Sequence, residues 1–146
     1  FRMNDIQSAL GVSQLKNLKV FLKKRNQIAK FYHDNLKNLP IKLQKIEKNF
    51  YSTYHLFIIK LDIKYKHLHK KFFNYLRSKN MYVNVHYLPI HLQPFYQKFG
   101  FKKNQFPVAK EYSETAISIP IYPNLKKREQ IKIINYIKLF FKKYAW

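Results

Sequence analysis

The segment from Met81 to Tyr96 constrains the fold most, because it joins an alternating strand pattern to a proline stop. Side chains alternate between apolar and polar from Met81 to Tyr87, which is typical of a strand with two unlike faces. The apolar face would carry Met81, Val83, Val85 and Tyr87. Pro89 has no backbone N–H and favours an extended Leu88, so it ends the strand. The sequence therefore predicts a strand that leaves its sheet near Leu88.

Two imidazoles, one phenol and one amide gather around this strand end: Asn84, His86, Tyr87 and His91. Side chains that follow a strand into an outward turn are well placed to bind a ligand. A purely structural role is the alternative. In that case His86 and Tyr87 are half-buried strand residues, and His91 lies at the surface or caps a helix. The pattern alone leaves both interpretations open.

A long helix is predicted within residues 1–40. Asn4 and Gln7 have the spacing of a capping box, and apolar residues recur at helical spacing from Ile6 up to Pro40. Two further strands are predicted, Tyr54–Asp62 and Ala116–Ile121, and the first of them should be covered on both faces at its centre. The sequence therefore indicates a sheet of about three strands.

Helical patterns separate and follow these strands. They cover Lys66–Lys79, with Asn80 ending the helix, then Pro94–Phe99 up to Gly100, and a segment that begins at Pro107. Asn124 is predicted to cap a last helix whose buried face carries Ile131, Ile134, Ile137 and Phe141. Strands separated by helices indicate an α/β fold. We divide the chain into a helical segment, residues 1–40, and a small α/β domain, residues 41–146.

The formal net charge of +22 raises a second class of function, a basic nucleic-acid-binding domain. Lysine supplies 25 of the 29 basic residues, whereas nucleic-acid readers rely on the bidentate arginine fork. Lys, Ile, Asn, Phe and Tyr are all abundant and all have AT-rich codons, so a compositional bias of the genome can raise the charge without selection for a partner. The alternative is a basic surface that favours an anionic substrate or an acidic neighbouring domain. Clustered exposed aromatic side chains and a continuous basic groove would favour nucleic acid. A polar cleft at His86 would favour an enzyme.

Several kinds of site lack support in the sequence. The chain has no Cys, and it has only seven acidic residues. Two pairs of histidines occur close together in sequence, His67 with His69 and His86 with His91, but neither pair has further metal ligands nearby. We therefore expect no metal site. No run of about 18 uncharged apolar residues and no signal-peptide pattern occurs, so we expect a cytoplasmic protein that spans no membrane.

Three segments resemble one enzyme family, and they occur in that family's order. They are Phe1-Arg-Met-Asn-Asp-Ile-Gln-Ser-Ala-Leu-Gly11, Asn84-Val-His-Tyr-Leu-Pro-Ile-His-Leu-Gln-Pro-Phe-Tyr96 and Ala116-Ile-Ser-Ile-Pro-Ile-Tyr-Pro123. The family is that of the DegT/DnrJ/StrS sugar-nucleotide aminotransferases, which use pyridoxal 5′-phosphate. The segment around His86 is most similar to the 4-aminotransferases of pseudaminic acid biosynthesis.

The resemblance implies the small C-terminal domain of a fold-type-I aminotransferase, preceded by a long inter-domain helix. The large domain, with the Schiff-base lysine and most of the cofactor site, would precede Phe1, so we expect no catalytic residue in this chain and assign no residue to the cofactor. The implied substrates are an amino-acid donor, glutamate, and a UDP-linked 4-keto-6-deoxy-N-acetylhexosamine aminated at C4. A different sugar nucleotide, aminated at C3 or C4, is the alternative within the family.

The resemblance also implies a homodimer with residues of both subunits at each site. It implies substrate-binding roles for Arg2, His86 and Tyr87, for the backbone of Leu88 and Pro89, and for the nearby His91.

Overall fold

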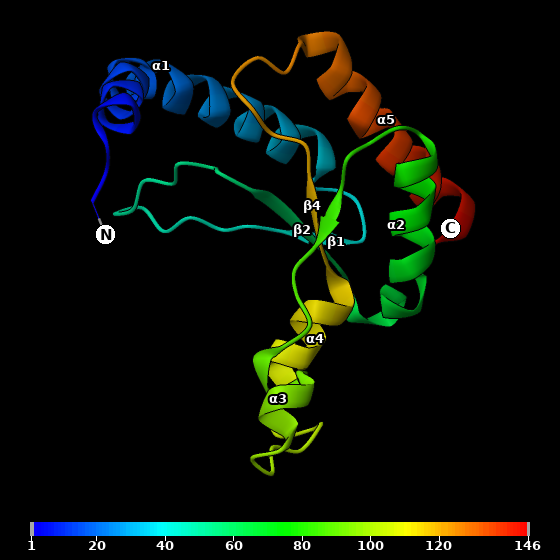
Figure 1. Cartoon of the computed structure of the whole chain (residues 1–146). Coiled ribbons are helices and arrows are strands. Elements are labelled where there is room, and N and C mark those ends of the chain that lie inside the picture. The colour runs from blue at the N-terminus through cyan, green and yellow to red at the C-terminus, as the bar shows by residue number, and fades with distance from the viewer. Residues whose placement is uncertain (1, 146) are drawn as a thin grey trace.

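One antiparallel sheet of four strands organises the chain, of which the computed structural model describes residues 2–145 (Figure 1). Its strands lie in the order β1 (Ile41–Leu43), β2 (Phe57–Leu61), β4 (Ala116–Ile119) and β3 (Asn84–Val85). The α/β architecture is as predicted. The sequence missed β1, because its three residues are too few for a periodic pattern and it is recognisable only through its pairing with β2.

The helices follow the predicted order. They are α1 (Asp5–Leu36), α2 (His69–Ser78), α3 (Pro94–Gln97), α4 (Pro107–Thr115) and α5 (Lys127–Tyr144), with 3₁₀ turns at Ile63–Leu68 and Ile90–Leu92. Asn4 caps α1 as predicted, since its side chain accepts a hydrogen bond from the Gln7 backbone N–H at 2.9 Å. Asn80 and Gly100 both have positive φ, 58° and 84°, where their helical segments end.

The core lies between one face of the sheet and the helices α1, α2 and α5 (Figure 1). Phe57, Ile59 and Leu61 of β2 point into this core, together with Ile117 and Ile119 of β4. The Tyr32 hydroxyl of α1 is buried and donates to the Pro120 carbonyl at 2.8 Å, which ties the helix to the chain after β4. One face of the sheet is therefore packed in the core, and the other face is available to line a site.

The second face of β2 is only half covered, which corrects the prediction of a strand covered on both sides. Ile58 and Lys60 point toward α4 and are half-buried. Lys60 pairs with Glu111 of α4 at 3.4 Å. A single short helix replaces the full layer expected there, so space remains between this face and the chain beyond β3.

Two predictions about α5 are wrong. Asn124 does not cap the helix, because the Glu129 carboxylate accepts the Lys126 backbone N–H at 2.8 Å and starts the helix two residues later than Asn124 predicts. Ile131 is 44% exposed. It lies at the margin of the apolar stripe, whose buried members are Ile133, Ile134, Ile137, Phe140 and Phe141.

The first two-thirds of α1 contributes nothing to the core. From Asp5 to Gln27 no side chain is buried, and the burial of α1 begins at Ile28. Apolar side chains at Ile6, Leu10 and Leu15 are more than 60% exposed. Figure 1 shows this part of the helix extending away from the sheet. The predicted long helix is confirmed, whereas its role as a connection between domains stays a prediction.

Candidate functional site

The predicted strand before Pro89 is shorter than its sequence pattern. Only Asn84–Val85 pairs as β3, at the edge of the sheet, with Asn84 opposite Ser118 and Val85 opposite Ile117. Met81 and Val83 are buried, as the alternation predicts, but Val85 and Tyr87 are exposed and His86 is buried. The alternation fails there because the helical layer does not reach past Val83, and the second face supplies the burial instead.

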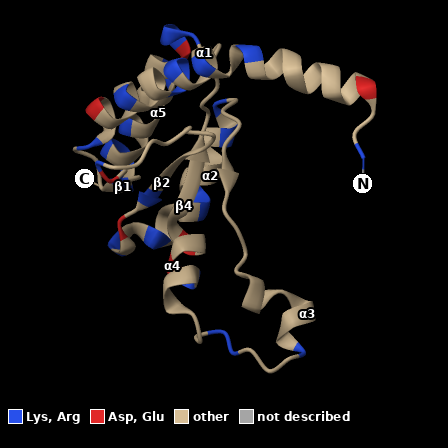
Figure 2. Ribbon diagram, turned by 90° about the vertical axis from the view of Figure 1, so that its left-hand side faces the viewer, with Lys and Arg blue, Asp and Glu red and all other residues tan. Residues whose placement is uncertain are grey.

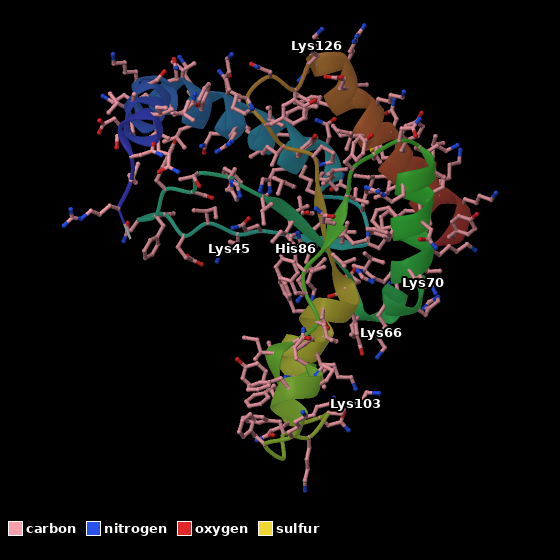
Figure 3. All side chains as sticks on the ribbon, viewed as in Figure 1. Lys45, Lys66, Lys70, His86, Lys103 and Lys126 are labelled. Carbon is pink, nitrogen blue, oxygen red and sulfur yellow. The ribbon has the colours of Figure 1, made fainter. Side chains whose placement is uncertain are left out.

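His86 lies where β3 leaves the sheet (Figure 3), and it is 6% exposed. Its Nε2 atom is 2.7 Å from the Ser118 hydroxyl of β4, and Ser118 is equally buried. Burial lowers the pKa of the His86 imidazole below its usual value, because the charged form loses hydration. His86 is therefore a neutral, anchored imidazole rather than a half-buried strand residue.

Tyr87 is the exposed neighbour of His86. The two rings touch edge to face, with centroids 4.7 Å apart, while Tyr87 remains 72% exposed. Both residues line a cavity of about 810 Å³ between β2, α4 and residues 86–90. The other lining side chains are mostly apolar, among them Leu56, Ile58, Phe106 and Val108, with Tyr112 and Gln105 as polar members.

Leu88 and Pro89 continue the wall of the same cavity. Leu88 is 54% exposed and Pro89 is buried. The structure therefore brings together four of the predicted site residues, His86, Tyr87, Leu88 and Pro89, along one edge of a single cavity.

His91 lies in a second, adjoining cavity. This space of about 520 Å³ shares Pro89, Ile90, Phe106 and Ala109 with the first one. His91 is 6% exposed and packs on Phe106, with ring centroids 4.9 Å apart, so it is neither a surface residue nor a helix cap. Its Nε2 atom is buried, and no protein group in the described chain accepts or donates a hydrogen bond there.

Arg2 is exposed and lies just before α1. Arg2 lines neither the cavity at His86 nor the cavity at His91. Any shared site of Arg2 and His86 needs a further part of the protein.

Sequence reasoning missed Ser118 and the cavity wall formed by α4. Ser118 is the one polar side chain in the otherwise apolar strand Ala116–Ile119, all of which is buried. A lone hydroxyl in a buried strand needs a hydrogen-bond partner, and this need was the available signal. Phe106 and Val108 carry no such signal, because apolar residues near a helix start are common in any packed domain.

The described residues do not fit a pyridoxal phosphate site of their own. A Schiff-base lysine needs a desolvated amine, yet no lysine of the chain is buried, and only Lys60 and Lys110 are even half-buried. Figure 3 shows the labelled lysines projecting outward from separate elements. Among residues 2–145, no group of three or more His, Cys, Asp or Glu side chains has the geometry for a metal ion.

The surface shows a mixture of the features that would separate an enzyme from a nucleic-acid-binding domain. Basic residues are spread over α1, α2, α4 and α5 (Figure 2). Exposed aromatic side chains do cluster around α3 and the following loop, where Phe95 contacts Tyr96 and Phe99. The cavity at His86 is apolar rather than polar, which is not what we expected of the enzyme. No helix in the described chain is both long and apolar enough to cross a bilayer.

Comparison with known proteins identifies the family of this chain. The DegT/DnrJ/EryC1/StrS aminotransferase family matches residues 1–138. The uncharacterized protein MJ1066 of Methanocaldococcus jannaschii is 36% identical over 141 residues, which are 94% of this chain and 36% of that protein. The UDP-4-amino-4,6-dideoxy-N-acetyl-beta-L-altrosamine transaminase of Helicobacter pylori is 33% identical over 127 residues, 86% of this chain and 33% of the transaminase.

The fold agrees with these matches. The structure of Helicobacter pylori PseC, an aminotransferase of pseudaminic acid biosynthesis, superposes with a TM-score of 0.90 at 29% identity, over 99% of this chain and 39% of PseC. This chain thus has the fold found in part of a fold-type-I aminotransferase, and it spans between 33% and 39% of the length of these relatives. The chain belongs to the DegT/DnrJ/EryC1/StrS aminotransferase family.

Proposed function

We propose that this chain is the C-terminal domain of a sugar-nucleotide aminotransferase that uses pyridoxal 5′-phosphate. The reaction would move an amino group from glutamate to C4 of a UDP-linked 4-keto-6-deoxy-N-acetylhexosamine, a step toward pseudaminic acid. The observation that carries the proposal is the family match over residues 1–138, which includes the whole His86–His91 segment. The resemblance to the altrosamine transaminase and to PseC supports this choice of sugar.

His86 and Tyr87 are the residues of this chain that we assign to the sugar nucleotide. A neutral imidazole has one nitrogen that donates and one that accepts, so it can hydrogen-bond a hydroxyl or a phosphate oxygen. The exposed Tyr87 hydroxyl offers a second such group at the mouth of the same cavity. The apolar wall formed by Leu56, Ile58 and Val108 suits the methyl groups of a 6-deoxy, N-acetylated sugar.

The cofactor belongs mainly to another part of the protein in this proposal. Pyridoxal phosphate supplies the electron sink for transamination when it is bound. Because no lysine here is buried, we assign the reactive lysine to residues outside this chain. The long exposed stretch of α1 would then connect the two domains, and Arg2 would reach a site completed by the large domain in a homodimer.

The test is replacement of His86 by Ala in the whole polypeptide that carries this chain. Loss of one neutral hydrogen bond costs about 0.5–1.5 kcal/mol, and up to about 3 kcal/mol if the partner is charged. We expect kcat/KM for the UDP-keto-sugar to fall roughly tenfold or more, with the melting temperature retained. The control is His67→Ala, because His67 is exposed and lines neither cavity of the candidate site.

Unchanged kinetics in His86→Ala would remove this residue from the site. Activity with dTDP-linked or GDP-linked keto sugars but none with the UDP-linked sugar would assign the protein to a different member of the family. Loss of the thermal transition would instead show that His86 is chiefly a packed strand residue.

A further inference from the structure

We propose that Ser118 is a positioning residue for His86: its hydroxyl holds Nε2 inward, so that Nδ1 is the imidazole nitrogen available to the sugar nucleotide. This inference deepens the proposed function and rests on it. Ser118 lies in the third segment of the family resemblance, Ala116–Pro123, but the resemblance assigns it no role. Its role rests only on its contact with His86.

The strand pairing explains why these two residues meet. Ser118 lies directly opposite Asn84, and His86 lies two residues beyond Asn84 on the same face of the strand. This diagonal relation brings a long side chain from an edge strand over the central strand β4. The resulting separation between Nε2 and the Ser118 Oγ is 2.7 Å, and both residues are 6% exposed.

The chemistry of the pair leaves one nitrogen free. A neutral imidazole has one nitrogen that donates and one that accepts, and a hydroxyl can satisfy either kind. With Nε2 engaged by Ser118, ligand contact falls to Nδ1, on the ring edge nearer the backbone. His86 also lines the large cavity, whereas Ser118 lines a separate cavity of about 490 Å³ between β3, β4 and α5. The hydrogen bond thus crosses the wall between the two spaces.

Without the hydroxyl, no side-chain hydrogen bond fixes the orientation of the ring. The neighbouring Tyr87 touches the imidazole only edge to face, at a centroid distance of 4.7 Å, and gives it no polar partner. The ring could then turn about its bond to Cβ and present either nitrogen. Ligand binding should weaken because only part of the population has the productive orientation.

The experiment is a double-mutant cycle in the whole polypeptide, with the UDP-linked 4-keto-6-deoxy-N-acetylhexosamine as substrate. We expect Ser118→Ala to raise KM about threefold to tenfold with little change in kcat, as for the loss of one neutral hydrogen bond. In the His86→Ala background, Ser118→Ala should have no further effect on KM, because the group it positions is gone. Ser118→Thr, which keeps the hydroxyl, should restore most of the affinity.

The control is Ser113→Ala on α4, whose half-buried hydroxyl donates to the Lys110 carbonyl at 2.8 Å and touches neither residue. It should leave KM unchanged. Nitrogen NMR of the labelled His86 ring gives an independent readout. The wild-type ring should show a protected, hydrogen-bonded Nε2, and Ser118→Ala should show two exchanging orientations.

The outcomes separate the two proposals. If His86→Ala raises KM while Ser118→Ala does not, or if the two effects add, Ser118 has no positioning role. If His86→Ala leaves the kinetics unchanged, the assignment of the site fails first, and the role of Ser118 toward a ligand falls with it. A Ser118→Ala protein that melts early but shows an unaltered His86 nitrogen spectrum would also overturn the inference.

Discussion

Two histidines have acid–base properties set by their surroundings. His33 packs edge to face on Phe57, with centroids 5.3 Å apart, and burial lowers its pKa, with a smaller opposing influence from the Asp34 carboxylate. Burial also lowers the pKa of His86. For both residues, the unfolded chain binds a proton more readily than the folded one does.

This difference predicts a stability that depends on pH in one direction. Above the unfolded-state pKa of about 6.5 both imidazoles are neutral in either state and the full stability is present. As the pH falls below that value, protons bind preferentially to the unfolded chain, and stability is lost until the lowered folded-state pKa values have been passed. We expect the free energy of unfolding to fall between pH 7 and pH 5 in urea titrations. His86→Gln and His33→Gln should each show a shallower slope than the wild type, because each removes one imidazole whose pKa is lowered by folding.

The predicted site residues show what a one-dimensional pattern can and cannot give. His86 and Tyr87 share a cavity because their spacing before Pro89 is local. His91 is only five residues from His86, yet it faces a different cavity, since the 3₁₀ turn at Ile90–Leu92 redirects the chain. Ser118 lies 32 residues away in sequence, and only the pairing of β3 with β4 brings it to His86. The spacing of apolar and polar residues along the chain does not reveal which strands pair, so it could not predict this contact.

At the scale of elements, α5 shows that the face of the helix on which a residue lies decides its burial, and not its type. Ile137 is fully buried and belongs to the core, while Ile131 on the same helix is 44% exposed. The long helices α1 and α5 were predictable because their patterns repeat over many turns. Strands β1 and β3, of three and two residues, were missed or overextended because pairing partners decide so short a strand.

Matched substitutions on α5 test this division. Ile137→Ala removes buried methyl groups and leaves a cavity, so we expect a loss of about 2–5 kcal/mol in the free energy of unfolding. Ile131→Ala deletes the same atoms from a half-solvated position, and we expect a change within about 0.5 kcal/mol. Chemical denaturation of both variants gives the comparison. Equal losses would contradict the assigned helix face.

At the scale of the molecule, charge is distributed very unevenly along the chain. No acidic residue occurs from Ile63 to Lys110, a stretch that includes α2, α3 and the exposed aromatic cluster. The basic residues in this stretch are nine lysines and Arg77. The chain belongs to an aminotransferase family, a class of protein that the charge alone does not indicate.

Binding to nucleic acid should therefore be non-specific. Lysine contacts with phosphates release counterions, so we expect affinity for a mixed-sequence duplex to fall by orders of magnitude between about 50 and 200 mM salt. Fluorescence anisotropy with two unrelated sequences measures this. Sequence-selective binding that persists at physiological salt would reverse the ranking of the two functional classes.

Chemical capture tests the cofactor assignment. The 146-residue chain alone, incubated with pyridoxal 5′-phosphate and then borohydride, should show weak labelling scattered over many lysines, because all of them are exposed or half-buried. Peptide mass spectrometry locates the label. Stoichiometric labelling of one lysine, together with turnover, would place the reactive residue in this chain after all.

Only the C-terminal end of α1 is buried in the core, so the rest of the helix can act as a lever. Its 32 residues span about 48 Å at 1.5 Å per residue, and the core clamps only the part from Ile28 onward. A tilt of about 5° at the clamp displaces the far end by about 3 Å, a hydrogen-bond length. Small repacking around Tyr32 and Leu36 is therefore amplified at Asn4 and Arg2, far from where it occurs.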